Sequence, residues 1–174
     1  MRTPLTEIRY ETPIENIDFQ EQTVFLAGPT VRGHQPHLTS WRFEAADLFK
    51  KRGFAGNVII PEFTNKLESD QFRYDIPIWE FKGLQRSHVI MFWIPRTREL
   101  IGLTTNHEFG YWMARDRSKM VYGRPDGAYR ISYLDIMWAE DSKRRALHGD
   151  KWFPIYNTLE KTVDAALKKL NGDI

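Results

Sequence analysis

The chain has 174 residues, of which 41% are hydrophobic and 14% aromatic, and its formal net charge is +2. These values predict one globular domain, residues 1–174, and give no support for a nucleic-acid polymer as a partner. The absence of cysteine excludes disulfides and cysteine-ligated zinc. No apolar run approaches the roughly 20 residues of a membrane span, and the N-terminus lacks the apolar core of a signal peptide. We therefore expect a cytoplasmic protein without membrane contact.

Short apolar runs alternate with helical patterns along the chain. Residues 1–22 are polar and aperiodic, which indicates an extended arm or an irregular lead-in. Strands are predicted at residues 23–27, 57–60, 89–94 and 119–122, each followed by glycine or proline. Helices are predicted from Trp41 to about Gly53, from a cap at Asp75 onward, and at residues 106–116 and 159–170. Residues 128–174 are interpreted as a C-terminal helical extension, with residues 140–151 charged and exposed.

This alternation predicts an α/β fold with a central, mostly parallel sheet between two helical layers, of the Rossmann-like or flavodoxin-like type. Ligands of such folds bind at the loops that follow the strands. These are residues 28–37, 61–74, 95–106 and 123–126. Gly28 and Pro29 would let the backbone approach a ligand closely. Arg32 and Arg42 either contact a phosphate or sugar hydroxyl, or are solvated surface arginines.

A carboxylate at the start of a predicted helix is the most informative side chain. Glu108 would stand in the first helical turn after a buried strand, where the helix N-terminus favours the ionised form. An ionised carboxylate in a crevice suits nucleophilic attack on a sugar carbon. The alternative is structural, because Thr105 and Glu108 also match a capping box with Thr105 as the N-cap.

A second carboxylate, Glu80, lies on the predicted buried stripe of its helix. Burial would raise its pKa and suit it to donate a proton. Alternatively, it lies at the edge of the stripe and pairs with Arg73, Lys82 or another basic side chain at the surface. Two carboxylates in different surroundings suit glycosidic chemistry, provided that Glu80 and Glu108 face one crevice.

No pattern in the chain indicates a cofactor. The dinucleotide-binding Gly-x-Gly-x-x-Gly sequence, the Walker loop and the Gly-x-Ser-x-Gly elbow are absent. His34 and His37 have no acidic neighbour, so no metal site is predicted. Aromatic residues near the predicted loops, among them Trp79, can stack on a nucleobase, although most of them should belong to the core.

Four blocks, at residues 25–29, 79–84, 89–95 and 105–111, together resemble the nucleoside 2-deoxyribosyltransferase family and the related nucleoside 5′-monophosphate N-glycosidases. The similarity runs over roughly residues 23–125 and implies a flavodoxin-like fold. It also implies cofactor-free cleavage of the N-glycosidic bond of 2′-deoxynucleosides. Glu108 occupies the place of the family's nucleophile, which forms a covalent deoxyribosyl intermediate. Glu80 stands where the family has an aspartate that handles the nucleobase. Its longer side chain leaves its role open.

The resemblance implies a homo-oligomer and does not extend to residues 128–174. Asn106 and Tyr111 are candidates to bind a sugar hydroxyl or to hold Glu108.

Three functions remain open. The first transfers deoxyribose from a nucleoside to a free nucleobase or water. The second hydrolyses nucleoside 5′-monophosphates, with Arg32, Arg42 and the helix start at residues 104–106 as phosphate ligands. The third is a nucleotide-binding sensor without catalysis.

Overall fold

The computed structural model describes residues 4–35, 37–65, 74–149 and 153–174. Its strands form one six-stranded sheet in the order β1-β3-β2-β4-β5-β6, and every neighbouring pair is parallel. The strands are β1 (Thr6–Ile8), β2 (Thr23–Ala27), β3 (Asn57–Ile59), β4 (Val89–Trp93), β5 (Met120–Gly123) and β6 (Ile155–Tyr156). The helices are α1 (Trp41–Lys51), α2 (Asp75–Arg86), α3 (Leu103–Asp116), α4 (Ser132–Ala146) and α5 (Leu159–Leu170), with 3-10 turns η1 (Ile14–Asn16) and η3 (Arg117–Lys119).

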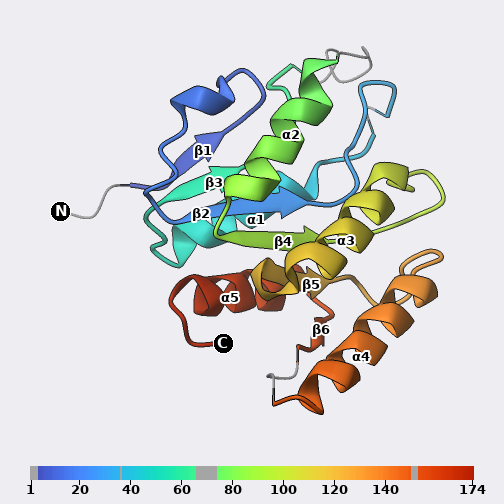
Figure 1. Cartoon of the computed structure of the whole chain (residues 1–174). Coiled ribbons are helices and arrows are strands. Elements are labelled where there is room, and N and C mark those ends of the chain that lie inside the picture. The colour runs from blue at the N-terminus through green and yellow to red at the C-terminus, as the bar shows by residue number, and fades with distance from the viewer. Residues whose placement is uncertain (1–3, 36, 66–73, 150–152) are drawn as a thin grey trace.

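Helices cover both faces of the sheet (Figure 1). Helices α2, α3 and α4 pack on one face, where Phe25 and Phe92 of the strands belong to the same core cluster as Phe109 and Trp138. Helices α1 and α5 pack on the other face, around residues such as Val24. Successive strand residues point to opposite faces, so a strand covered on both sides needs a continuous apolar run. The predicted three-layer α/β fold is confirmed, and the sheet is wholly parallel.

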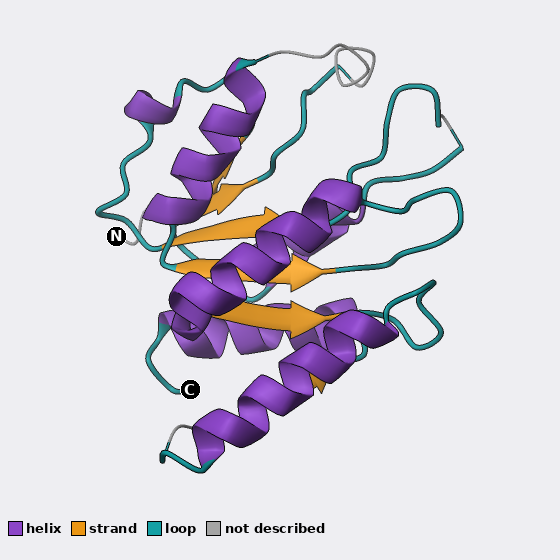
Figure 2. Cartoon of the chain, turned by 45° about the vertical axis from the view of Figure 1, so that its right-hand side comes forward, coloured by secondary structure: helices purple, strands orange, loops and turns teal. Residues whose placement is uncertain are grey.

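The strand order positions the loops. From β3 to β6 it is the flavodoxin-like order, with β1 added outside β3. After β2 the chain passes to β3, which is the neighbour of β2 on one side. After β3 it crosses to β4, which is the neighbour of β2 on the other side. The loops that follow β2 and β4 therefore diverge, which is where such sheets bind ligands. Figure 2 shows the loops beyond the arrowheads of these strands.

The four predicted strands are present within one residue of their predicted ends, and α5 has the predicted bounds. Strands β1 and β6 were not predicted, because two or three residues are too few to show a periodicity. The predicted N-terminal arm thus contains a strand, and so does the predicted C-terminal helical extension. The charged stretch from residue 140 onward continues α4 to Ala146, and Ser142 within it is buried. Asp75 is the first residue of α2 and not its cap, which is Tyr74.

The start of α3 differs from the prediction. The helix begins at Leu103, and its N-cap is Gly102, whose φ is 62°. A Cβ atom on Gly102 would lie 2.7 Å from Cγ of Pro29, so close approach and positive φ both require glycine. Thr105 lies inside the helix and is buried, so the capping-box interpretation is wrong. Glu108 consequently falls in the second turn of the helix and not in the first.

Candidate active site

Helices α2 and α3 lie side by side on one face of the sheet (Figure 1), and Glu80 of α2 is close enough to Glu108 of α3 for its charge to act on that carboxyl group. Both residues are partly buried. Burial, followed by the charge of Glu80, raises the pKa of Glu108 to about 8, and the charge of Arg42 opposes this rise. The expectation that a helix N-terminus keeps Glu108 ionised is therefore wrong, because the residue is too far along the helix and too buried.

Glu80 has a raised pKa as well. Burial raises it, while a hydrogen bond from the Tyr10 hydroxyl and the charges of Arg42 and Arg32 lower it. The predicted alternative pairing with Lys82 is wrong, because the Lys82 ammonium lies 3.0 Å from the Glu15 carboxylate in an exposed ion pair. The other predicted partner, Arg73, lies outside the described residues.

Two neighbouring carboxyl groups with raised pKa values titrate as a pair. Placing both negative charges in a partly buried site is costly, so the pair retains one proton over part of the pH range. In that state one group is an ionised carboxylate and the other is a carboxylic acid. The arrangement can thus supply a nucleophile and a proton donor at the same place.

Arg42 is almost completely buried, and its charge acts on both carboxyl groups. Its Nε donates to the Leu26 carbonyl at 2.8 Å, and its Nη2 donates to the Gly28 carbonyl at 2.6 Å. Its Nη1 lies 2.7 Å from Oε1 of Glu62 and 3.3 Å from the Pro29 carbonyl. Both sequence-based interpretations of Arg42 are therefore wrong. It is not a solvated surface arginine, and its donors are taken by the protein instead of a phosphate.

Gly28 and Pro29 belong to the loop that follows β2, and they pack against the end of β4 and the loop that follows it. Gly28 has φ 153°, and a Cβ atom there would overlap the carbonyl oxygen of Trp93. Pro29 is buried, and its carbonyl accepts a hydrogen bond from Nε1 of Trp41 at 3.0 Å. These contacts hold the backbone of the β2–α1 loop in place beside α3.

Trp79 belongs to the hydrophobic core and packs on Tyr10. Its ring centroid lies 5.0 Å from that of Tyr10, and its Nε1 donates to the Thr12 carbonyl at 2.8 Å. The side chain is buried, and its ring packs on Tyr10, whose hydroxyl contacts Glu80.

Asn106 and Tyr111 lie on different sides of α3. Asn106 is two residues before Glu108 and therefore about 200° away around the helix, so the two side chains diverge. Its Oδ1 accepts a hydrogen bond from Nη2 of Arg96 at 2.7 Å. Tyr111 is one turn after Glu108 and packs against Phe81 of α2, with ring centroids 5.9 Å apart. The structure thus brings Tyr111 near Glu108 and leaves Asn106 apart.

Arg32 is exposed on the β2–α1 loop and lines a pocket of about 290 Å³. Gly102, Leu103 and Thr104 at the start of α3 line the same pocket. This pocket lies where the loops after β2 and β4 diverge, as expected for the fold. The charge of Arg32 also reaches Glu80, whose pKa it lowers.

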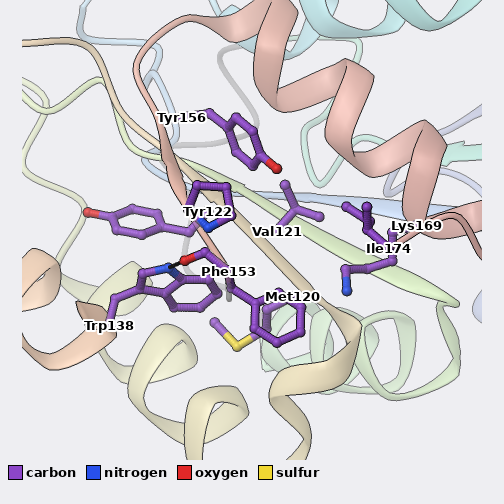
Figure 3. A pocket seen from close by; sticks show the side chains of 9 residues that line it. Met120, Val121, Tyr122, Trp138, Phe153, Tyr156, Lys169 and Ile174 are labelled. Atoms are coloured by element: carbon purple, nitrogen blue, oxygen red, sulfur yellow. Dashed lines mark hydrogen bonds between the residues drawn. The ribbon is translucent and has the colours of Figure 1, made fainter. Parts of the chain in front are cut away.

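A second pocket, of about 70 Å³, is small and mostly apolar. Figure 3 shows its lining, which includes Met120, Trp138, Phe153 and Ile174. None of the predicted site residues and no aspartate or glutamate side chain lines it. Within the described ranges, no group of three or more His, Asp or Glu side chains is arranged to hold a metal ion.

Tyr10 is the site residue that the sequence did not reveal. It lies in the stretch interpreted as an arm, where no motif or periodicity singles it out. The pairing of β1 with β3 and the contacts of the segment after β1 bring Tyr10 to Glu80.

Comparison with known proteins gives one match. The family model described as nucleoside 2-deoxyribosyltransferase like matches residues 21–127, a range that includes Glu80 and Glu108 but not Tyr10. No curated protein is a significant match to the chain. In the part of the chain that the structure describes, no helix is long and apolar enough to cross a bilayer.

Proposed function

The chain belongs to the nucleoside 2-deoxyribosyltransferase-like family, and on this premise we propose that it cleaves the N-glycosidic bond of 2′-deoxynucleosides and transfers deoxyribose to another nucleobase or to water. The observation that carries the proposal is the meeting of Glu80 and Glu108 in one partly buried site. Burial raises the pKa of both carboxyl groups, so the pair can hold one proton near neutral pH.

In the first half of the reaction, an ionised Glu108 oxygen attacks C1′ of the sugar and forms an ester bond. The electron pair of the breaking N-glycosidic bond moves to the nucleobase nitrogen. Because Glu108 attacks only when ionised, the productive arrangement places the shared proton on Glu80. That proton passes to the nucleobase, which leaves as a neutral molecule.

In the second half, Glu80 accepts a proton from the incoming nucleobase or from water. The activated nitrogen or oxygen attacks C1′ and displaces the Glu108 carboxylate, so the sugar keeps its configuration. Deoxyribose lacks the electron-withdrawing 2′-hydroxyl, which makes its oxocarbenium-like transition state easier to reach. A placed carboxylate and a protonated leaving base then suffice, without a cofactor.

The test is the intact mass of the protein after incubation with 2′-deoxynucleosides, together with an assay of base exchange. We expect a deoxyribosyl adduct that peptide mapping assigns to Glu108. Glu108→Gln should form no adduct and lose at least about 10³-fold in kcat. Glu160→Gln, an exposed residue at the start of α5, is the matched control and should be unaffected. An unchanged rate in Glu108→Gln would reject the nucleophile assignment, and binding without turnover would favour a sensor.

The pocket between Arg32 and the start of α3 favours a second candidate, the hydrolysis of nucleoside 5′-monophosphates. A cation and a helix N-terminus that line one pocket suit a phosphate group. Assays of dGMP and dCMP beside the matching deoxynucleosides distinguish the two functions. In the hydrolase, Arg32→Gln should raise KM for the monophosphates and leave KM for the nucleosides unchanged. A preference for free nucleosides would argue against the phosphate site.

We also propose that the protein forms a homo-oligomer. Exposed apolar side chains on α2 and α4, among them Ile78, Tyr133 and Ile136, support this proposal. Light scattering after size-exclusion chromatography should show a mass above that of one chain, and a monomer at micromolar concentration would contradict it.

A further inference from the structure

We propose that Tyr10 is a positioning residue for Glu80, whose hydroxyl fixes one carboxyl oxygen so that the other carries the proton toward the nucleobase. The inference rests on the proposed function, because it concerns the same proton transfer. Tyr10 precedes residues 21–127, so the match to the family does not include it.

The first support is the contact itself. The Tyr10 hydroxyl donates a hydrogen bond to Oε1 of Glu80, although the two residues are 70 positions apart in the chain. The Tyr10 ring packs against Phe63 at 4.8 Å and against Trp79 at 5.0 Å between ring centroids. The ring is thus held by aromatic neighbours from two other segments, and its hydroxyl points at the carboxyl group.

The second support is the anchoring of the backbone around Tyr10. Its amide donates to the Glu62 carbonyl at 3.4 Å, just after β3. The Thr64 amide donates to Oε1 of Glu11 at 2.6 Å, and the Trp79 ring nitrogen donates to the Thr12 carbonyl at 2.8 Å. Strand β1 immediately precedes this segment and pairs with β3. The hydroxyl is therefore placed by a fixed scaffold, as a positioning group requires.

The hydrogen bond from Tyr10 determines which oxygen of Glu80 carries the proton. A protonated carboxyl group carries its proton on one oxygen, and the Tyr10 hydrogen atom already occupies the approach to Oε1. The proton of Glu80 therefore resides on Oε2. When that proton moves to the nucleobase nitrogen, the same hydrogen bond stabilises the carboxylate left behind. Burial and the charge of Glu80 raise the pKa of Tyr10, so the phenol stays protonated and remains a donor throughout.

The charged groups around Glu80 set the direction of the expected pH effect. Glu108 faces it from α3, Arg42 from α1 and Arg32 from the β2–α1 loop. On α2 itself, Lys82 pairs with Glu15. The Tyr10 hydrogen bond favours ionised Glu80, so its removal makes the carboxyl pair hold its protons to higher pH.

Tyr10→Phe keeps the ring and removes only the hydroxyl. We expect kcat for base exchange to fall at least about tenfold and KM to change by less than about twofold. Both limbs of the pH profile should move upward by about one pH unit. Tyr156→Phe removes a hydroxyl from β6, at the opposite edge of the sheet from β1, and is the matched control. If Tyr10 serves only ring packing, Tyr10→Phe behaves like the unmodified protein, and that result overturns the proposal.

A second measurement needs no turnover. The Glu80 carboxyl titration, followed by NMR with ¹³C-labelled glutamate and assigned with Glu80→Gln, should move upward in Tyr10→Phe. In Glu80→Gln, the ultraviolet titration of Tyr10 should move to lower pH, which tests the contact even if Tyr10→Phe does not fold. Unchanged titrations overturn the proposal. Shifted titrations in a protein that forms no adduct support the contact and reject the proposed function instead.

Discussion

The guanidinium of Arg42 lies 2.7 Å from the carboxylate of Glu62, and both side chains are almost completely buried. The Ser40 hydroxyl donates to the same carboxylate oxygen at 2.6 Å, so the pair joins the start of α1 to the segment after β3. The remaining Arg42 donors bind carbonyls at the end of β2 and in the loop that follows it. One buried cation thus fixes the loop after β2, and its charge opposes the rise that burial causes in the pKa of Glu80 and Glu108.

Arg42→Met should lower the free energy of unfolding by about 3–5 kcal/mol, because it leaves the Glu62 carboxylate buried without its partner. Urea titrations measure the loss. Arg52→Met is the matched control on the same helix, since Arg52 pairs with Asp164 at the surface. Its loss should be about 1 kcal/mol or less. Equal losses in the two variants would show that the buried pair contributes no more than an exposed one.

Glu108 should make stability depend on pH. The pKa of Glu108 is about 8 in the folded protein, against 4.5 for an unperturbed glutamate. Between these values the folded state binds more protons than the unfolded state, so the free energy of unfolding falls as pH rises. Glu108→Gln removes this contribution and should be more stable than the unmodified protein at pH 8 by at least about 1 kcal/mol. The difference should vanish near pH 4, and a gap that is constant with pH would contradict the assignment.

Asp141 should have the opposite dependence. Partial burial alone would raise its pKa, but hydrogen bonds from Arg144, Arg117 and Arg145 outweigh burial and lower the pKa to about 2. The ionised group therefore stabilises the fold above the unfolded pKa of 3.8, and this stability disappears as pH falls through about 2. Asp141→Asn should cost about 2 kcal/mol at pH 7 and almost nothing near pH 1, below both pKa values. Thermal unfolding across this range measures it, with the exposed Asp164→Asn as the control.

Gly28→Ala should destabilise the protein by at least about 2 kcal/mol. The added Cβ would overlap the Trp93 carbonyl, would lie 2.8 Å from Cζ2 of Trp41, and would require positive φ. Gly110→Ala is the matched control, because no described atom lies within 4 Å of a Cβ built there. In the middle of α3 it should raise stability by about 0.5–1 kcal/mol. Chemical denaturation compares the two, and a Gly28→Ala loss below 0.5 kcal/mol, on the order of an exposed substitution, would refute the clash.

Much of the fold could be predicted because its signals are local. The runs at β2 and β4 are apolar at every position, since helices cover both faces of each strand. The pattern of α5 is equally local, with Val163 and Ala166 turned toward the sheet. The start of α3 was misplaced because Thr105-x-x-Glu108 imitates a capping box, whereas close packing of Gly102 on Pro29 decides where the helix begins.

By itself, the sequence determined the α/β class, the strands of the sheet interior and two glutamates worth testing, because each of these depends on neighbouring residues or on an ordered set of motifs. Tertiary structure decided that the charges of Glu80 and Arg42 both act on Glu108, and that Tyr10 reaches Glu80 from the segment after β1. These relationships join segments far apart in the chain, and burial sets the protonation of the carboxyl pair. A pattern of neighbouring residues contains neither the distances between such segments nor the surroundings that determine a pKa.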